Sequence, residues 1–422
     1  MERYNEYKDS GVQWLGEIPS HWGLRRTKYV WKETDSRLEF GSEQLLSVSQ
    51  YDGVRKAQLD SRSESLKGYK IVKQDELVIN IMLAWLGGLG VSKHEGIVSP
   101  AYCVYKLQDA QNPRFLHYLY RTPMYLAEFA RHSTGIVPSR WRMYTDDFGE
   151  VLTLLPPIEE QDAMVAYLDT AIAKIDEAIA QQKKMIEFLN ERKQIIINNA
   201  VTKGLNPDAP MKDSGVDWIG EIPEHWEFVK LKRYCKIRTG KTPSTTKEYY
   251  FENGDIKWFT PGDLNKFELV DSERKVTYRA QLEQACNMFP ANTVYLVGIG
   301  GTIGKVGFCE TEATCNQQIN AIIPNGQKIN HKFLAHLIQS TKVQILRLAN
   351  FSTLPIINQD RTGTLNIVVP PISEQESIVN ILENKSAPIN AAIKAAEKQI
   401  SLLQERKQII INDVVTGKVK VS

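Results

Sequence analysis

The sequence has few cysteines and no long apolar run. None of its five cysteines forms a CxxC pair: Cys103, Cys235, Cys286, Cys309 and Cys315. An odd, scattered set of this kind is typical of reduced thiols and lacks the usual zinc spacings. The longest apolar stretch, residues 77–91, contains Asn80 and is too short to span a bilayer. With a polar segment at residues 1–10 and no signal-peptide pattern, we expect a cytoplasmic protein without a membrane segment.

The chain also lacks a charge excess of either sign. Its 52 Lys and Arg against 50 Asp and Glu leave a net charge of +2 over 422 residues. Because free-standing DNA-binding proteins are often far more basic, a nucleic-acid partner would require local positive charge or help from other subunits. The length predicts two or three domains, each able to bury a core.

Catalytic and metal-binding motifs are missing as well. The segment GIGGTIGKV (298–306) has Ile299 in place of the first P-loop glycine and Val306 in place of Ser or Thr, and Ile303 breaks GxGxxG. We therefore expect a glycine-rich turn between strands there. There is no HExxH motif, no Pro-Pro methyltransferase motif and no nuclease cluster of carboxylates and lysine. These absences predict a binding protein with no catalytic residue, no metal site and no cofactor of its own.

What the chain does contain is an internal repeat in four parts. KDSGVQWLGEIPSHW (8–22) returns as KDSGVDWIGEIPEHW (212–226), and LPPIEEQDAMVAYLD (155–169) returns as VPPISEQESIVNILE (369–383). ERKQIIIN (191–198) returns unchanged at 405–412, whereas the segments between the motifs differ in length and sequence. Such self-similarity indicates a duplicated unit. We expect variable domains at 1–155 and 204–369, each beginning with a tryptophan motif, and repeated helices at 156–203 and 370–422.

The variable segments show mixed α/β patterning. Strands are expected at 76–81, 97–105, 294–297, 319–323 and 365–369, and helices at 113–131 and 330–349. The fold class is therefore α/β (α+β), with two similar domains, a pseudo-twofold repeat and a long antiparallel two-helix coiled coil between them.

The coiled coil is predicted by apolar residues at a 3-4 spacing after each Pro-Pro pair. Four seam residues of each helix are expected to pack across the pair: Ile175, Ile179, Ile186 and Leu189 against Ile389, Ile393, Ile400 and Leu403. Ser386 and Pro388 predict a helix break followed by a new helix from about 387 to 414, and Thr170 marks a similar break in the first half. The alternative is that each amphipathic helix packs only on its own domain.

This order of motifs resembles the specificity subunit of Type I restriction–modification enzymes over essentially the whole chain. The resemblance rests on the paired tryptophan motifs, the Pro-Pro segments and the ERKQIII helices, and on IRTGKTPS (237–244), KWFTPGDLN (257–265), residues 77–102 and GGTIGKVG (300–307). It implies that each variable domain is a target-recognition domain for one half of a bipartite, asymmetric site in double-stranded DNA.

The resemblance also implies that the chain is not catalytic. It implies that the helices dock two modification subunits, which are methyltransferases that use S-adenosylmethionine, and that restriction subunits using ATP and Mg complete the endonuclease. Two other functions remain open: a coiled-coil scaffold without DNA specificity, and a nucleotide-dependent enzyme that uses residues 298–306.

Direct reading of DNA requires polar or basic side chains on loops that reach base edges. In the first domain the candidates are Ser47, Ser49, Gln50, Tyr51, Arg55, Lys56, Ser133, Thr134, Ser139, Arg140 and Arg142. In the second domain they are Lys241, Thr242, Ser244, Lys247, Asp263, Asn265, Lys266, Ser352, Thr353, Asn358 and Gln359.

Overall fold

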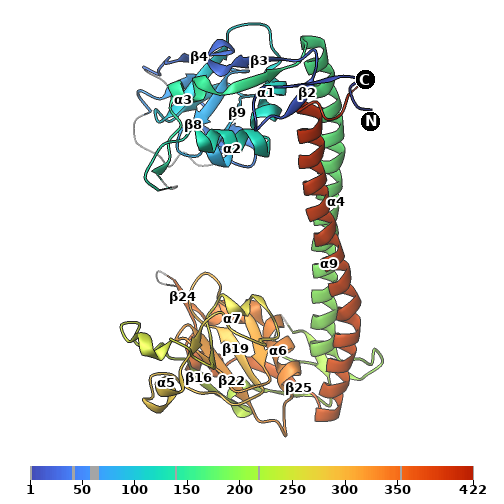
Figure 1. The fold of residues 1–422 in the computed structure, drawn as a ribbon. Helices are drawn as coiled ribbons and strands as arrows, with labels where there is room; N and C mark the ends of the chain where they lie inside the picture. The colour runs from blue at the N-terminus through green and yellow to red at the C-terminus, as the bar shows by residue number, and fades with distance from the viewer. Residues whose placement is uncertain are drawn as a thin grey trace. The chain divides into compact units, whose positions relative to one another are not determined.

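The chain forms two compact units, which are described separately. The first unit comprises Met1–Lys183 with Glu397–Ser422, and the second comprises Lys184–Ala396. The computed structural model describes residues 2–39, 43–57, 66–137, 140–216, 219–351 and 354–421. Each unit combines a mixed α/β domain with segments of the same two long helices, α4 (Ile158–Lys203) and α9 (Ile372–Val415) (Figure 1).

The first unit is built on an antiparallel sheet with the strand order β4-β11-β8-β9. These strands are β4 (Trp31–Thr34), β11 (Tyr102–Leu107), β8 (Leu77–Asn80) and β9 (Leu89–Val91). Strand alternation separates two cores. Leu77 and Ile79 pack with the aromatic residues of the helices, whereas Val78 and Val104 pack with the hairpin of residues 46–56.

The remaining elements of the first unit surround this sheet. The strands are β1 (Tyr7–Asp9), β2 (Glu17–Pro19), β3 (Gly23–Arg26), β5 (Leu46–Ser49), β6 (Gly53–Lys56), β7 (Lys70–Val72), β10 (Gly96–Val98) and β12 (Leu152–Leu155). The helices are α1 (Pro113–Tyr120), α2 (Pro123–Arg131), α3 (Thr145–Glu150), η1 (Thr27–Tyr29) and η2 (Ala84–Leu86). Strands β3 and β12 pair antiparallel and so bring the two ends of the variable domain together.

The second unit repeats the plan with the order β16-β22-β19-β20. These strands are β16 (Cys235–Thr239), β22 (Ile319–Pro324), β19 (Thr293–Val297) and β20 (Val306–Cys309). Strand β19 is buried along its whole length. Val294 and Leu296 face the core shared with α6, while Tyr295 and Val297 face the core that contains Phe259.

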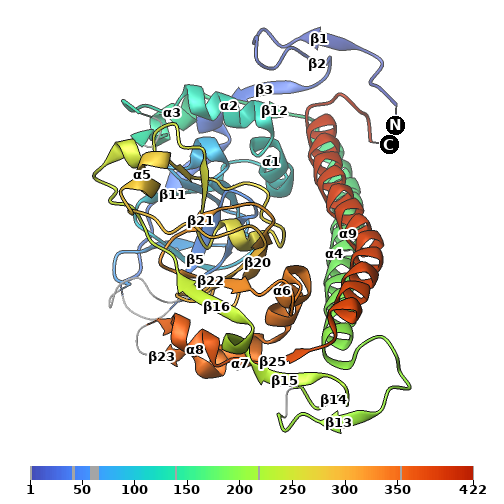
Figure 2. The same cartoon turned by 90° about the horizontal axis from the view of Figure 1, so that it is seen from below.

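Further strands and helices complete the second unit (Figure 2). The strands are β13 (Met211–Asp213), β14 (Glu221–Pro223), β15 (Glu227–Lys230), β17 (Ile256–Phe259), β18 (Lys275–Val276), β21 (Thr314–Cys315), β23 (Asn350–Phe351), β24 (Pro355–Ile356) and β25 (Asn366–Val369). The helices are η4 (Leu231–Arg233), η5 (Glu248–Tyr250), η6 (Asp263–Asn265), α5 (Tyr278–Leu282), α6 (His331–Ser340), α7 (Lys342–Leu348) and α8 (Gln359–Gly363).

The expected strands are present, but residues 97–105 fall into β10 and β11 and not one strand. The single helices expected at 113–131 and 330–349 were also wrong, because each is two helices. Pro123 has no N–H and begins a new helix. The hydroxyls of Thr122 and Thr341 each bond a carbonyl three residues earlier, at the point where the first helix ends.

The helix pair confirms the predicted coiled coil but not the predicted breaks. In the first unit Ile175 and Ile179 are buried and Ile400 and Leu403 are half-buried, while most of the positions between them are exposed. In the second unit Ile389 is buried, and Ile186, Leu189 and Ile393 are half-buried.

Helix α9 runs without a break through Pro388. Ser386 is a buried seam residue and not a helix cap. An interior proline costs about 3 kcal/mol, and burial of the neighbouring seam side chains Leu382 and Ile389 compensates for that cost. Thr170 likewise lies inside α4, where its hydroxyl bonds the Ala166 carbonyl.

The two ends of the chain meet in the first unit. The Lys420 amide donates to the Glu2 carbonyl at 2.8 Å, and the Tyr7 hydroxyl donates to the Gly417 carbonyl at 3.0 Å. No helix among the described residues is long and apolar enough to cross a membrane.

Candidate nucleic-acid interface

The repeated motifs build the same joint between domain and helix in each unit. In the first unit, Glu160 at the start of α4 accepts hydrogen bonds from Trp22 Nε1 at 3.1 Å, His21 Nε2 at 2.6 Å and the Tyr4 hydroxyl at 2.9 Å. Partial burial alone would raise the pKa of Glu160, but the bonds from His21, Tyr4 and Trp22 hold that pKa below its usual range. The carboxylate therefore clamps the tryptophan motif to the helix.

The second unit reproduces this joint with Glu374, which accepts from Trp226 Nε1 at 3.2 Å and from His225 Nε2 at 2.8 Å. The next residue of each motif is a buried glutamine. The side-chain oxygen of Gln161 accepts from the backbone N–H of Asn112 at 2.9 Å, and that of Gln375 accepts from the backbone N–H of Asn330 at 2.8 Å.

Each asparagine also caps the helix that follows it, α1 or α6. A charged pair completes each joint, with Arg114 bonding Asp169 in the first unit and Lys332 bonding Glu383 in the second. The tryptophan motif and the Pro-Pro motif are thus repeated together because they contact each other.

The first group of predicted DNA-contacting residues lies on one hairpin. Ser47 and Ser49 are in β5, Arg55 and Lys56 are exposed in β6, and Gln50 and Tyr51 occupy the turn between them. The Tyr51 side chain is 80% exposed. This hairpin therefore presents polar and aromatic side chains outward from an anchored backbone.

The anchor of this turn is Arg121, immediately after α1. Its Nη1 donates to the carbonyls of Gly87 and Leu89 at 2.8 and 2.7 Å, and its Nη2 donates to those of Gln50 and Tyr51 at 2.9 and 2.7 Å. Gly87 has φ +88°, and a Cβ there would lie 3.1 Å from the Gln50 carbonyl oxygen. Burial lowers the pKa of Arg121, while nearby Asp52 opposes that shift.

In the second predicted segment of the first unit, residues 133–142, Thr134 and Arg142 lie opposite each other. Their backbones exchange two hydrogen bonds of 2.9 Å. Ser133 is half-buried and Arg140 is exposed, whereas Ser139 lies outside the described residues. The structure connects this segment to the β5–β6 hairpin through η2 and the residues beside it.

Contacts on both sides of η2 make this connection. Trp85 packs edge-on against Trp141 with ring centroids 5.2 Å apart, and Gly87 lies against Gln50. The connecting segment is apolar and exposed, since Met82, Leu83 and Leu86 are each about two-fifths accessible. The interface of the first unit therefore combines polar and apolar groups.

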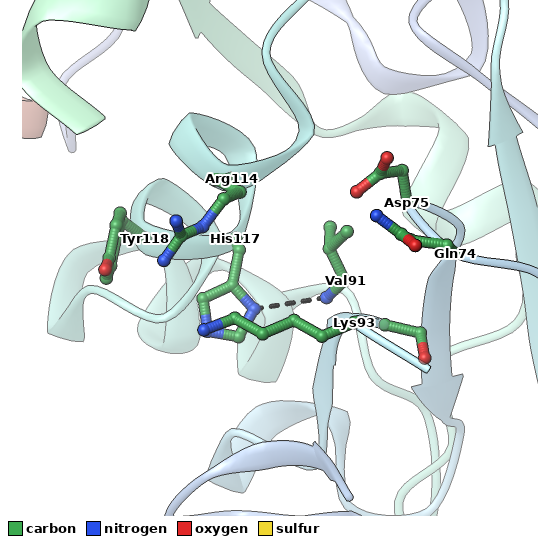
Figure 3. Close-up of a pocket in the computed structure, with 8 residues that line it drawn as sticks. Gln74, Asp75, Val91, Lys93, Arg114, His117 and Tyr118 are labelled. Atoms are coloured by element: carbon green, nitrogen blue, oxygen red, sulfur yellow. Dashed lines mark hydrogen bonds between the residues drawn. The ribbon is translucent and has the colours of Figure 1, made fainter. Parts of the chain in front are cut away.

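A groove of about 640 Å³ begins beside the β5–β6 turn. It runs between Tyr51, Lys93, Arg121 and the helix residues Asp176 and Lys407. A smaller pocket of about 300 Å³ shares Lys93, His117 and Tyr118 with it (Figure 3). The exposed Lys93 is thus placed along a polar depression.

His117 is fixed in this pocket by the Val91 amide, which donates to Nδ1 at 3.1 Å (Figure 3). Burial, with the nearby cations Arg121, Lys93 and Arg114, lowers the pKa of His117 to about 3. The imidazole is therefore neutral near pH 7 and carries its proton on Nε2.

The predicted residues of the second unit fall in three segments. Lys241, Thr242, Ser244 and Lys247 follow β16; Asp263, Asn265 and Lys266 lie in or after η6; Asn358 and Gln359 begin α8. Ser352 and Thr353 lie outside the described residues. Gln359 accepts from the Thr239 amide at 3.3 Å, so the structure brings α8 to the end of β16, where the first segment begins.

Several of these side chains also make intramolecular contacts. The carboxylate of Asp263 accepts three hydrogen bonds, from the amide and hydroxyl of Thr260 and from the Glu273 amide. It therefore shapes its own turn. Lys247 lies over the Tyr250 ring at 5.2 Å from the centroid, and Lys241 donates to the Gln284 carbonyl at 2.6 Å.

The glycine-rich segment 298–306 is a turn between β19 and β20, as expected. A phosphate-binding P-loop leads into a helix, whereas a strand follows here. Lys305 donates to Asn265 and lines a cleft of about 440 Å³ together with Lys266 and Lys342. The geometry therefore disfavours a P-loop and places three lysines around one polar cleft.

The helix pair carries a second repeated feature. Seam lysines of the two ERKQ motifs reach across the pair, Lys407 to Asp176 at 2.7 Å in the first unit and Lys193 to Asn390 at 2.8 Å in the second. On the outer faces, Phe188 and Ile195 of α4 are 58% and 52% exposed. Their repeat equivalents in α9, Leu402 and Ile409, are 49% and 51% exposed.

Known proteins with similar sequences and folds support the resemblance to Type I specificity subunits. Residues 223–402 match the family described as the Type I restriction modification DNA specificity domain. The putative type I restriction enzyme MjaX specificity subunit from Methanocaldococcus jannaschii is 22% identical over 447 aligned positions, which cover 96% of each chain. The chain is thus similar to Type I specificity subunits over nearly its whole length.

A shorter but stronger similarity supports this assignment. The Type I restriction enzyme EcoR124I/EcoR124II specificity subunit from Escherichia coli is 31% identical over 185 residues, 43% of this chain and 46% of that relative. The alignment thus spans about half of each protein. A chain from a structure on complex assembly and conformational transition of the type I R-M system has a TM-score of 0.69 and covers 95% of this chain at 15% identity, which shows the fold.

Sequence reasoning missed several residues that shape the candidate interface. Arg121, Lys93 and Lys342 were not candidates, and Lys305 was weighed only as part of a P-loop. Arg121 stands beside Thr122-Pro123, a helix boundary that could have directed attention to it. No local pattern marks Lys93 or Lys342.

Proposed function

We propose that this chain is the sequence-specific DNA-recognition subunit of a Type I restriction–modification complex and reads a bipartite, asymmetric site. The observation that carries the proposal is the duplicated joint around two dissimilar surfaces. Trp22 with Glu160 and Trp226 with Glu374 mount the two domains in the same way. Two domains that are joined to the helices in the same way but differ in their surfaces suit the recognition of two different half-sites.

In this proposal each domain reads bases with the loops described above. In the first unit the readers are the β5–β6 hairpin and residues 133–142, and in the second they are the segments after β16 and η6 and the start of α8. Lys93 of the first unit and Lys266, Lys305 and Lys342 of the second would contact phosphates, which gives affinity without sequence preference.

The chain itself would perform no chemistry. Among the described residues, no group of three or more His, Cys, Asp or Glu side chains could hold a metal ion. S-adenosylmethionine would bind to modification subunits, and ATP with Mg to restriction subunits. Within a cytoplasmic complex of this kind, the partners would also supply part of the positive charge that a net charge of +2 does not provide.

The outer faces of the helices would dock the two modification subunits. Phe188 and Ile195 lie seven residues apart, two turns along one face of α4, and Leu402 and Ile409 repeat this spacing in α9. Exposed apolar side chains that recur at equivalent positions suit two copies of one partner. Scaffolding without DNA specificity would leave two dissimilar polar loop surfaces on identical mounts unexplained.

The proposal is tested by binding of duplex DNA to the complex reconstituted with its modification subunits. The methylated adenines in host DNA, mapped by sequencing, supply the target. We expect salt-sensitive retention of duplexes with both half-sites and loss of binding when either half-site is scrambled. Equal binding of scrambled duplexes would show that the subunit does not confer specificity.

Docking is tested separately with a matched pair of variants. Phe188→Asp with Leu402→Asp places charge on the exposed apolar faces, and Asn190→Asp with Gln404→Asp places the same charge two residues further, on another face. We expect the first variant to lose co-purification with modification subunits and the control to retain it, with both unfolding at the wild-type temperature. Equal assembly of both variants would exclude this docking surface.

A further inference from the structure

The four hydrogen bonds of Arg121 join two segments that are distant in sequence. Its Nη1 donates to the carbonyls of Gly87 and Leu89, and its Nη2 donates to those of Gln50 and Tyr51. At Gly53 the backbone of the β5–β6 turn also lies against α1 and Arg121, since a Cβ there would lie 3.0 Å from His117 Cε1 and 3.6 Å from Arg121 Nη1. The backbone of the turn is therefore fixed from behind while its side chains face solvent.

We propose that Arg121 is a positioning residue for recognition of the half-site read by the first unit. It sets the backbone of the β5–β6 turn, so that the side chains of Gln50 and Tyr51 project in one direction toward base edges. Arg121 itself does not touch DNA in this scheme. The inference rests on the proposed function in DNA recognition and adds a residue that determines how the turn is held.

Only arginine can make this set of contacts. Its planar guanidinium carries five donors in a fixed fork, whereas lysine offers one ammonium group and glutamine one amide. Four carbonyl acceptors from two turns match the two terminal nitrogens of that fork. Substitution would remove the side-chain donor from these four carbonyls and would release the turn from Gly87.

The second unit has no described counterpart of this anchor. The turn between β19 and β20 corresponds to the β8–β9 turn that contains Gly87, and a Cβ added there at Gly304 would have Lys342 Cγ as its nearest neighbour at 3.3 Å, an aliphatic contact. The Lys305 ammonium donates a hydrogen bond to the Asn265 side chain. Loss of Arg121 should therefore affect only the half-site of the first unit, and the other half-site serves as a control within the same complex.

The test uses the complex with its modification subunits and competition between duplexes that carry single substitutions in one half-site. We compare wild type with Arg121→Met, Arg121→Lys and the exposed control Arg37→Met, whose native guanidinium bonds Asp35. We expect Arg121→Met to reduce discrimination in the first half-site by about tenfold, the scale of one good base contact. The discrimination of Arg121→Lys should lie between those of wild type and Arg121→Met, and the discrimination of Arg37→Met should equal that of wild type.

A second measurement separates positioning from folding. Hydrogen exchange of the amides of residues 50–53 should accelerate in Arg121→Met, while the amides of β8 and of the second unit keep wild-type rates. The inference is overturned if the wild-type complex discriminates at both half-sites and Arg121→Met and Arg121→Lys do so equally well, or if both half-sites lose discrimination together. A wild-type complex without base preference would overturn the proposed function and this inference with it.

Discussion

Lys407 Nζ lies 2.7 Å from Asp176 Oδ1 and connects α9 to α4 in the first unit. In the second unit the equivalent lysine, Lys193, bonds the neutral Asn390 at the position that repeats Asp176. Burial lowers the pKa of Lys193. Both lysines stand where a coiled-coil seam normally carries an apolar residue, and a polar seam residue specifies register at a cost in stability.

We therefore expect Lys193→Leu with Lys407→Leu to stabilise the chain while weakening assembly. The lost ion pair is worth little because Asp176 is 52% exposed. Burying two leucines should add about 1 kcal/mol, or about 2–4 °C in unfolding temperature. Thermal unfolding and co-purification with modification subunits measure both effects, with exposed Lys398→Leu as the control. A lower unfolding temperature would show that the lysines contribute stability and not register.

The joint at Glu160 predicts acid sensitivity of the first unit. Its pKa is held below 4.5 in the folded protein, so its charge stabilises the fold above that value, and the stabilisation is lost as pH falls through the lowered folded pKa. Glu160→Gln should cost about 1–2 kcal/mol at pH 7 and progressively less below about pH 4.5. Urea unfolding at pH 7 and pH 4 gives these values. Exposed Glu159→Gln is the control, and a difference independent of pH would contradict the prediction.

The seam isoleucines predict a separation between assembly and base reading. Ile179→Ala should cost about 2 kcal/mol, at the low end for a buried isoleucine because 9% of the residue is exposed, and Ile393→Ala should cost less. We expect the double variant to assemble poorly with modification subunits, whereas base preference within each half-site persists because those contacts are local. Exposed Lys394→Ala should change neither. Altered base preference in the double variant would indicate that the helices shape the recognition loops directly.

Exchange of residues 23–153 for the same segment of a relative should change one half-site only. The exchange keeps Trp22 and Glu160 and therefore the hydrogen bond between the tryptophan motif and α4, and β3 and β12 bring the two ends of the exchanged segment together. Mapping methylated adenines in host DNA reads both half-sites at once. A hybrid that changes both half-sites, or neither, would contradict independent recognition by the two domains.

Much of this architecture could be predicted because it follows from periodic spacing of apolar residues and from internal repeats in the sequence. The 3-4 spacing that includes Ile175 and Ile179 predicted the helix seam, since burial follows the helical period. The repeats predicted a common mount, although not that its bond joins Trp22 to Glu160. The break expected near Pro388 was wrong because a local rule gave way to packing along the whole helix.

The interface was harder to predict, since its shape depends on contacts between distant segments. Arg121 donates to backbone carbonyls, and every residue type has a carbonyl, so the sequence does not show which residues Arg121 contacts. Asp263 was expected to face DNA because of its polarity, yet its oxygens accept bonds from Thr260 and Glu273. Whether it also reads a base stays a prediction.

The Arg121 anchor also has a thermodynamic consequence for the two half-sites. A turn that is ordered on folding loses little further entropy when a ligand arrives, so more of its contact energy appears as affinity. The β19–β20 turn of the second unit, which carries the proposed phosphate contact Lys305, contains Gly300, Gly301 and Gly304, and glycine loses more backbone entropy on ordering than any other residue. Calorimetry should therefore find a larger unfavourable entropy for contacts in the second half-site, and the two domains of one subunit would recognise DNA with different temperature dependences.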